Sequence, residues 1–321
     1  MTVTVQSITP NFAAEVGDVT LGGPLAAEDL AAIRAAFTQY AVLVFPDQEF
    51  EDESQLDFAR NFGPLETTVF KARKDHKLRL HENMADVGNL DAENRILSAD
   101  DRQRLYNLGN RLWHTDSSFK RLPAYCSMLH ARSIPPIGGQ TEFADMRAAY
   151  DALPEATRRR IAGLVAEHSI MTSRAKLGFS DFDESEREAF KPVPQVLVRR
   201  LQDSGRMSLY IASHAGAIRG MADNEAKTFP PARKSACPPC APSVAPSSES
   251  AILRNAAGVI RRRRPGPSAR RSAPRRTPWR GACRADNAGR RIPGRDAWCS
   301  GRPRSRGPSP ASDGCRRTGA A

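Results

Sequence analysis

Arg111-Leu112-Trp113-His114-Thr115-Asp116-Ser117-Ser118-Phe119 places an imidazole and a carboxylate two residues apart. In an extended strand, residues i and i+2 point to the same face, so His114 and Asp116 can reach one metal ion from one side of a sheet. One histidine and one carboxylate are two of the three ligands in the facial triad that holds Fe(II) and leaves positions open for substrate and O₂. A His-x-Asp triplet also arises from composition alone. Here Trp113 and Phe119 flank the pair, an arrangement typical of the mouth of an apolar pocket.

Three further segments accompany this one in a fixed order. They are Ala59-Arg60-Asn61-Phe62-Gly63-Pro64-Leu65-Glu66, Gly138-Gly139-Gln140-Thr141-Glu142-Phe143 and Asp145-Met146-Arg147-Ala148-Ala149-Tyr150-Asp151-Ala152-Leu153-Pro154. Together the four segments resemble the taurine and 2,4-dichlorophenoxyacetate dioxygenase family, and most closely its phenoxyacetate branch. The resemblance runs from about residue 8 to about residue 226.

The resemblance implies an oxidoreductase, a dioxygenase that depends on Fe(II) and on 2-oxoglutarate as cosubstrate. Such an enzyme consumes O₂, releases succinate and CO₂, and hydroxylates a small anionic organic substrate such as an aryloxyacetate. The resemblance also implies an α+β fold, a double-stranded β-helix (jelly roll) with flanking helices. The order of the expected elements alone supports an α+β fold with an antiparallel sheet.

The resemblance assigns roles to five residues. It makes His114 and Asp116 metal ligands, Thr141 a hydrogen-bonding partner of the 2-oxoglutarate carboxylate, and Lys71 and His214 neighbours of the substrate. Two of these residues also have a purely structural explanation. Thr141 fits as an ordinary strand threonine and Lys71 as a solvated loop lysine.

Apolar spacing and turn residues predict the elements that surround these motifs. We expect helices at 25–40, 52–62 and 154–167, strands at 41–45 and 125–131, a β-hairpin from 195–200 and 206–213, and a long loop over 71–110.

The composition changes abruptly at Lys227. The last 95 residues hold 22 Lys plus Arg and 4 Asp plus Glu, a net charge of +18, whereas residues 1–226 carry a net charge of −6. The later part also holds 14 of the 24 prolines and shows no apolar period. We therefore expect an incomplete dioxygenase domain over 1–226, with its last strands missing, and a disordered Arg/Pro-rich tail over 227–321.

The family has a second histidine ligand well over a hundred residues after the first pair, and an arginine for 2-oxoglutarate roughly ten residues later. No histidine follows His214 in this chain. His130, His168 and His214 are the candidates for a substitute. His130 fits better as a packed strand residue and His168 as a cation at a helix C-terminus, while His214 matches a pocket position. A change of reading frame near 224–227 is the economical explanation of the tail.

A second class of function stays open at this stage: a catalytically dead remnant, or a basic protein that binds polyanions through the tail. The arginines of the tail lack interleaved aromatic residues, so nucleic-acid binding beyond a non-specific one is not expected. The first 19 residues do not resemble a signal peptide, no run is long enough for a membrane span, and Cys126 is the one cysteine before the break. We therefore expect a cytoplasmic protein that does not enter membranes.

Overall fold

A computed structural model describes residues 3–49, 51–72, 77–133, 141–222, 225, 243–244, 250–254 and 258–262 of the chain, with the backbone alone for the last three segments. All of them belong to one compact unit, Met1–Ala269.

The helices are α1 (Ala27–Tyr40), α2 (Asp52–Arg60), α3 (Arg102–Asn107), α4 (Met146–Asp151), α5 (Glu155–Ile161), α6 (Ile170–Ala175) and α7 (Glu184–Ala189), with 3-10 turns η1 (Val69–Ala72) and η2 (Leu108–Arg111). The strands are β1 (Thr4–Ser7), β2 (Ala14–Gly17), β3 (Val42–Phe45), β4 (Cys126–His130), β5 (Thr141–Asp145), β6 (Val165–His168), β7 (Val193–Val196), β8 (Val198–Arg200), β9 (Met207–Leu209), β10 (Ala215–Ile218), β11 (Ser243–Val244), β12 (Ser250–Arg254) and β13 (Gly258–Arg262).

The N-terminal part packs α1 on a sheet with the strand order β1-β2-β3-β12-β4. Ile33 and Phe37 of α1 are fully buried among the side chains of β2 and β3, because their spacing of four residues places them on one face of the helix. The helix ends at Tyr40, where Ala41 takes a left-handed conformation with φ 63° and its N–H donates to Phe37 O. The expected helices at the front of the chain and the strand between them are confirmed by α1, β3 and α2.

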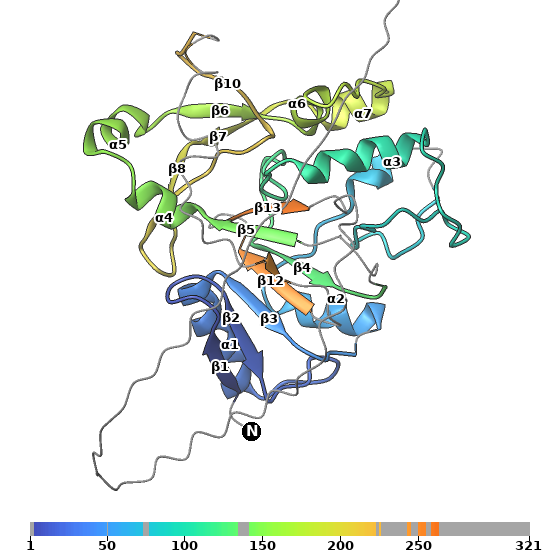
Figure 1. Ribbon diagram of the computed structural model, residues 1–321, viewed down its shortest axis with the longest axis vertical. Helices are drawn as coiled ribbons and strands as arrows, with labels where there is room; N and C mark the ends of the chain where they lie inside the picture. The colour runs from blue at the N-terminus through green and yellow to red at the C-terminus, as the bar shows by residue number, and fades with distance from the viewer. Residues whose placement is uncertain are drawn as a thin grey trace, which may run out of the picture. The chain divides into compact units, whose positions relative to one another are not determined.

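The strands at the end of the described chain pair with strands from its first half. In Figure 1, β12 lies between β3 and β4, and the register joins Ile252 to both Leu43 and Met128. β11 and β13 flank β5 in a separate three-stranded sheet. The expectation that the last strands are missing is therefore not confirmed. Pairing with an open sheet edge uses backbone groups, so it does not require the apolar period that is missing from this part of the sequence.

The third part of the fold contains the sheet β10-β6-β7 and the hairpin β8-β9. The hairpin confirms the expectation, with Val198 opposite Leu209 and Arg200 opposite Met207. The helix expected over 154–167 is wrong beyond Ile161. Ala162 leaves the helical conformation with ψ 126°, Gly163 follows with φ +76°, and the chain continues as β6.

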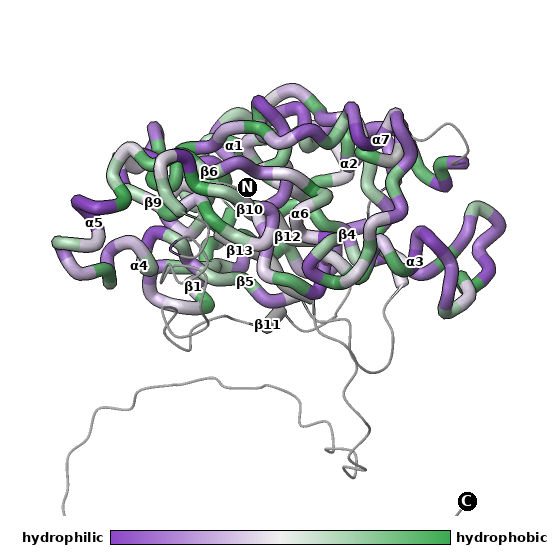
Figure 2. Tube along the Cα trace, turned by 90° about the horizontal axis from the view of Figure 1, so that it is seen from above, coloured by the Kyte–Doolittle hydropathy of each residue, from purple (hydrophilic) through white to green (hydrophobic). Residues whose placement is uncertain are grey.

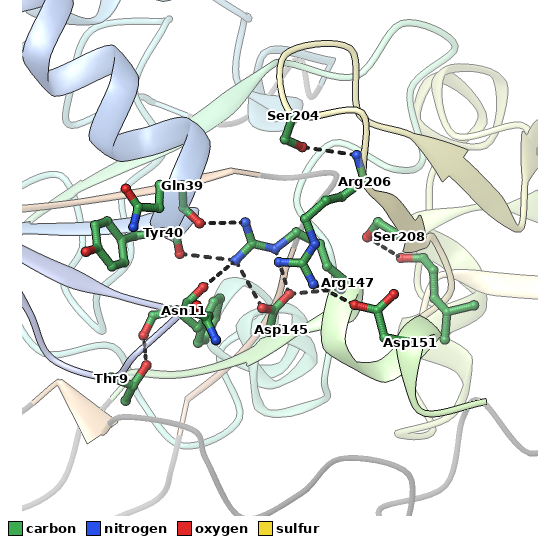
Figure 3. A network of polar contacts seen from close by, with 12 residues as sticks. Thr9, Asn11, Gln39, Tyr40, Asp145, Arg147, Asp151, Ser204, Arg206 and Ser208 are labelled. Carbon is green, nitrogen blue, oxygen red and sulfur yellow. Dashed lines mark hydrogen bonds and ion pairs between the residues drawn. The ribbon is translucent and has the colours of Figure 1, made fainter.

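A buried arginine ties these parts together (Figure 3). Arg147 is fully buried at the start of α4, and its guanidinium donates to both carboxylate oxygens of Asp145 at 2.9 and 3.0 Å. It also donates to the backbone carbonyls of Gln39 at 2.9 Å and Asn11 at 3.0 Å. One charged pair thus anchors α4 to the end of α1 and to the loop before β2.

Hydrophilic residues lie at the periphery of the described chain, and Figure 2 shows them along α3 and α5 at opposite ends of the view. Within the part of the chain that the structure describes, no helix is both long and apolar enough to cross a membrane.

Candidate metal centre

The structure brings His114 and Asp116 together, but through a turn. His114 is an isolated bridge residue and Asp116 begins the turn that follows, so the expectation that both lie on one regular strand is wrong. Ser117, directly after the carboxylate, has φ +61°, a left-handed conformation that is uncommon for a serine. His114 Nε2 and Asp116 Oδ1 lie 3.2 Å apart.

The hydrogen bonds of His114 determine which nitrogen can bind a metal ion. Its Nδ1 lies 2.8 Å from the backbone oxygen of Leu112, an acceptor only, so Nδ1 carries the proton. In the neutral ring, Nε2 then presents its lone pair to an oxygen of Asp116. A cation placed beside these two groups can bind both, and a backbone carbonyl behind the other ring nitrogen is typical of histidine metal ligands.

The pair therefore fits two ligand positions of a divalent metal ion. Among the described residues, no group of three His, Cys, Asp or Glu side chains is placed to hold such an ion. A third protein ligand is therefore not identified among the described residues. The loss of the family's second histidine, inferred from the sequence, stays a prediction.

His214 lies beside this pair. Its ring centroid is 5.8 Å from that of His114 and 5.0 Å from that of Phe119, both in edge-to-face geometry. The side chain is 1% exposed, and its Nδ1 has no hydrogen-bond partner within the described chain. Burial, with the neighbouring His114, lowers the pKa of His214 well below its ordinary value, so the ring is neutral. This position is consistent with the predicted pocket role, which stays a prediction.

The backbone around His214 is tied to the ligand segment. Ser213 N–H donates to the carbonyl of Trp113 at 2.9 Å, directly before His114, and the carbonyl of His214 accepts from Ser169 N–H at 3.0 Å. Lys176 Nζ donates to the carbonyl of Ser213 at 2.6 Å. The turn before β10 is therefore fixed against the segment that carries the ligands.

Arg174 is a residue of this region that the sequence analysis missed. It is 4% exposed, its guanidinium carbon lies 4.4 Å from the ring centroid of Tyr106, and it donates to Ser173 Oγ at 2.9 Å. Burial lowers its pKa, which Tyr106 and the charge of Asp116 oppose. A Cβ on Gly109 would lie 2.4 Å from the guanidinium carbon, so this glycine makes room for the cation. No local sequence signal distinguishes Arg174 from the surface arginines.

His168 corrects another expectation. It ends strand β6 rather than a helix, is 1% exposed, and stacks on Tyr210 with ring centroids 5.7 Å apart. Neither ring nitrogen has a hydrogen-bond partner among the described residues. Burial, with the charges of Arg199 and Lys176, lowers the pKa of His168 to about 4. The predicted helix-terminal cation is therefore wrong, because the residue is a neutral core histidine.

The remaining predicted residues lie on other elements. Thr141 begins β5, where its backbone pairs with Val244 and Arg262. Lys71 lies in η1, half exposed, and forms an ion pair with Glu82. His130 ends β4, and burial lowers its pKa. The roles assigned to Thr141 and Lys71 stay predictions.

Comparisons with known proteins bear on this arrangement. The profile of the family described as "Taurine catabolism dioxygenase TauD, TfdA family" matches residues 4–230. Over 221 residues the chain is 40% identical to the alpha-ketoglutarate-dependent 2,4-dichlorophenoxyacetate dioxygenase of Cupriavidus pinatubonensis, an alignment that covers 69% of this chain and 77% of that protein. It is 38% identical over 226 residues to the (S)-phenoxypropionate/alpha-ketoglutarate-dioxygenase of Sphingobium herbicidovorans, with coverages of 67% and 73%.

Solved structures agree with the sequence relatives. The crystal structure of AAD-2 with Mn(II) and N-oxalylglycine superposes with a TM-score of 0.76 at 40% identity, covering 83% of this chain and 93% of that one. A structure from Burkholderia xenovorans, described as a putative alpha-ketoglutarate dependent 2,4-D dioxygenase, gives a TM-score of 0.64 at 33% identity, with coverages of 81% and 90%. These likenesses confirm the predicted class of fold, the α+β jelly roll of these dioxygenases.

Proposed function

Because the chain belongs to the TauD, TfdA family of dioxygenases, we propose that it hydroxylates a small anionic organic substrate such as an aryloxyacetate. Membership of the family makes it an alpha-ketoglutarate-dependent dioxygenase, an oxidoreductase that uses Fe(II) and 2-oxoglutarate. The substrate class is taken from relatives named for 2,4-dichlorophenoxyacetate and (S)-phenoxypropionate. Hydroxylation beside the ether oxygen of such a substrate gives an unstable hemiacetal, which releases a phenol.

The single observation that carries the proposal is the facing of His114 Nε2 and Asp116 Oδ1 at 3.2 Å, with Nδ1 held by the carbonyl of Leu112. Bound Fe(II) supplies the activation of O₂ that inserts oxygen into a C–H bond while 2-oxoglutarate is converted to succinate and CO₂. His114 and Asp116 hold the metal, and Thr141 positions the cosubstrate. His214 and Lys71 contact the substrate, with the neutral ring of His214 and the ring of Phe119 helping to exclude water.

The tail enters the proposal because we expect it to lower the activity of the chain. We take 227–321 to be read out of frame, so that the second histidine ligand and the arginine for 2-oxoglutarate are lost from the printed chain. In this view the protein is cytoplasmic, and the part of the chain encoded as a dioxygenase domain spans 1–226, although β12 and β13 beyond it pair with β3, β4 and β5. The alternative is a catalytically dead remnant or a basic protein that binds polyanions, and the net charge of +18 after residue 226 favours the second of these.

One experiment separates the two functions. The purified chain is titrated with Fe(II) under anaerobic conditions and then assayed for succinate with aryloxyacetates, alkyl sulfonates and other small acids. Binding of Fe(II) that disappears in His114→Ala supports the dioxygenase. Binding of polyanions that disappears at moderate salt, with no bound Fe(II), supports the alternative.

A further inference from the structure

Glu66, which follows α2, holds the turn that carries Asp116. Its Oε2 accepts from Ser117 Oγ–H at 2.8 Å and lies 2.8 Å from Lys120 Nζ, and its Oε1 accepts from Ala124 N–H at 2.7 Å. One carboxylate therefore binds the beginning, middle and end of the segment that follows the metal ligand.

Gln195 of β7 holds the same turn from a different part of the fold. It is 4% exposed, and its Nε2 donates to the carbonyls of Ser118 at 3.0 Å and Lys120 at 2.8 Å. Its Oε1 accepts from the guanidinium of Arg199, which fixes the orientation of the amide. The amide nitrogen of Gln195 thus binds the turn, and its amide oxygen binds the arginine that orients the amide.

The turn needs such support because of its backbone. The left-handed conformation of Ser117 costs on the order of 1 kcal/mol for a residue with a Cβ. Conformations of this kind persist where surrounding contacts determine them, and they concentrate at functional sites. In this turn the conformation redirects the chain directly after Asp116, into the segment that Glu66 and Gln195 hold.

We propose that Glu66 and Gln195 are positioning residues that preset the geometry of Asp116 as a metal ligand. The proposal rests on the proposed function of His114 and Asp116 as ligands. Neither positioning residue contacts the metal ion. They act through the backbone and through Ser117, so that the carboxylate of Asp116 already faces His114 Nε2 before the metal binds, and less conformational entropy is lost on binding.

Two substitutions that keep the shape of the side chain test the proposal, each with a matched control. Gln195→Glu keeps the acceptor for Arg199 and removes both donors, and its control is Gln48→Glu. Gln48 also donates through Nε2 to two backbone carbonyls, those of Val19 and Pro46, but away from the metal turn. Glu66→Gln removes the charge that faces Lys120. Its control is Glu167→Gln, because Glu167 has the same side-chain exposure of 25% and an ion pair with Arg219 at 2.6 Å.

The first measurement is Mn(II) affinity of the full chain, followed by electron paramagnetic resonance of the free ion, which does not depend on turnover. We expect the Kd for Mn(II) to rise about tenfold in Glu66→Gln and Gln195→Glu, as for other residues that orient metal ligands. The two control variants should bind Mn(II) with the affinity of the unaltered chain while losing as much thermal stability as the test variants. Equal Mn(II) affinity in test and control variants would overturn the proposal.

The second measurement is amide hydrogen exchange of the peptide that contains Asp116 and Ala124, without metal. Exchange should be several-fold faster in the two test variants and unchanged in the two controls. If the unaltered chain binds no Mn(II), the proposed ligand role of Asp116 fails. The exchange data then decide separately whether Glu66 and Gln195 preset the turn, and unchanged exchange overturns that claim.

Discussion

Arg147 and Arg174 are both buried, yet their hydrogen bonding differs. Arg147 forms a bidentate pair with Asp145 and donates to three backbone carbonyls, so its charge and its donors are matched (Figure 3). Arg174 donates to Ser173 Oγ and, at 3.5 Å, to Asn110 Oδ1, and its Nε has no partner among the described residues. Among the described residues, no carboxylate forms an ion pair with Arg174.

This difference in hydrogen bonding indicates that Arg147 stabilises the fold, whereas Arg174 belongs to a functional region. Leaving a buried donor unsatisfied costs roughly 1–3 kcal/mol, so such groups are rare in a core that only has to be stable. Four residues near the candidate site or packed behind it, Arg174, His168, His214 and Tyr210, each have a buried polar atom without a hydrogen-bond partner in the described chain, as do residues elsewhere such as Asp29 and Gln55. None is found on Arg147, although it is buried as deeply.

The largest effect is expected from completing the site around His114 and Asp116. The lost arginine alone corresponds to roughly 1.5–3 kcal/mol of 2-oxoglutarate binding, about ten- to a hundredfold in affinity. The printed chain should therefore form little or no succinate, and restoring the reading frame after about Glu225 should raise succinate release at least about a hundredfold. His114→Ala or Asp116→Ala should abolish the restored activity. Equal, robust turnover by both forms under identical Fe(II), ascorbate and O₂ would contradict the expectation, and His214 would then be the first residue to substitute.

The next effect compares the two arginines directly. Arg147→Met leaves the carboxylate of Asp145 buried without its partner, and we expect a loss of about 3–5 kcal/mol in the free energy of unfolding. Arg174→Met removes a cation that forms no ion pair, so the change should stay within about 1 kcal/mol. Urea unfolding of the two variants measures both. A loss at Arg174 as large as that at Arg147 would show that the two arginines are structurally equivalent.

A smaller effect is expected from pH at His168. Its pKa is lowered to about 4 in the folded state, against an ordinary value of 6.5, so the folded state favours the neutral ring. The stability from this residue is present above pH 6.5 and is lost as the pH falls from 6.5 to 4. A shift of this size corresponds to about 3 kcal/mol. His168→Phe keeps the stacking on Tyr210 and should reduce the loss of stability between pH 7 and pH 5, measured by urea unfolding. The same loss in the variant and the unaltered chain would assign it to other groups.

The smallest effect on stability is expected from a substitution that fills the space beside Arg174. Gly109→Ala should destabilise the protein by about 1–3 kcal/mol, because the new methyl group meets the guanidinium. In an Arg174→Ala background the same substitution should have little effect, giving a coupling energy of about 1–3 kcal/mol in a double-mutant cycle of thermal or urea unfolding. Additive effects would mean that Gly109 is required for another reason.

Local pattern was enough to predict the elements whose partners are near in sequence. The apolar spacing of Ile33 and Phe37 located α1, and the short apolar run before Pro46 located β3. The expected helix was too long because the apolar residues Ile161, Leu164 and Val165 keep a helical spacing in the sequence. The backbone does not follow that spacing, since Gly163 has a left-handed conformation.

The candidate site was predictable in its residue types and not in its geometry. His114 and Asp116 do face each other, as the spacing of two residues suggested, but Asp116 begins a turn and does not continue a strand. The burial of Arg174 and the contacts of Glu66 and Gln195 depend on segments tens of residues away, and no local pattern records them. The resemblance to the family identified the segment that carries the ligands. The tertiary contacts of Glu66 and Gln195 identified the residues that fix this segment in place.

The insertion of β12 between β3 and β4 has a consequence for synthesis of the chain. During translation β3 and β4 leave the ribosome while their common neighbour, some 120 residues beyond β4, does not yet exist. For that interval two strand edges with unpaired N–H and C=O groups face each other across a gap, and such edges are templates for pairing with other chains. A nascent chain stopped before Ser250 should therefore depend on chaperones that cover β edges, and the time taken to translate this last stretch sets how long the nascent sheet stays exposed.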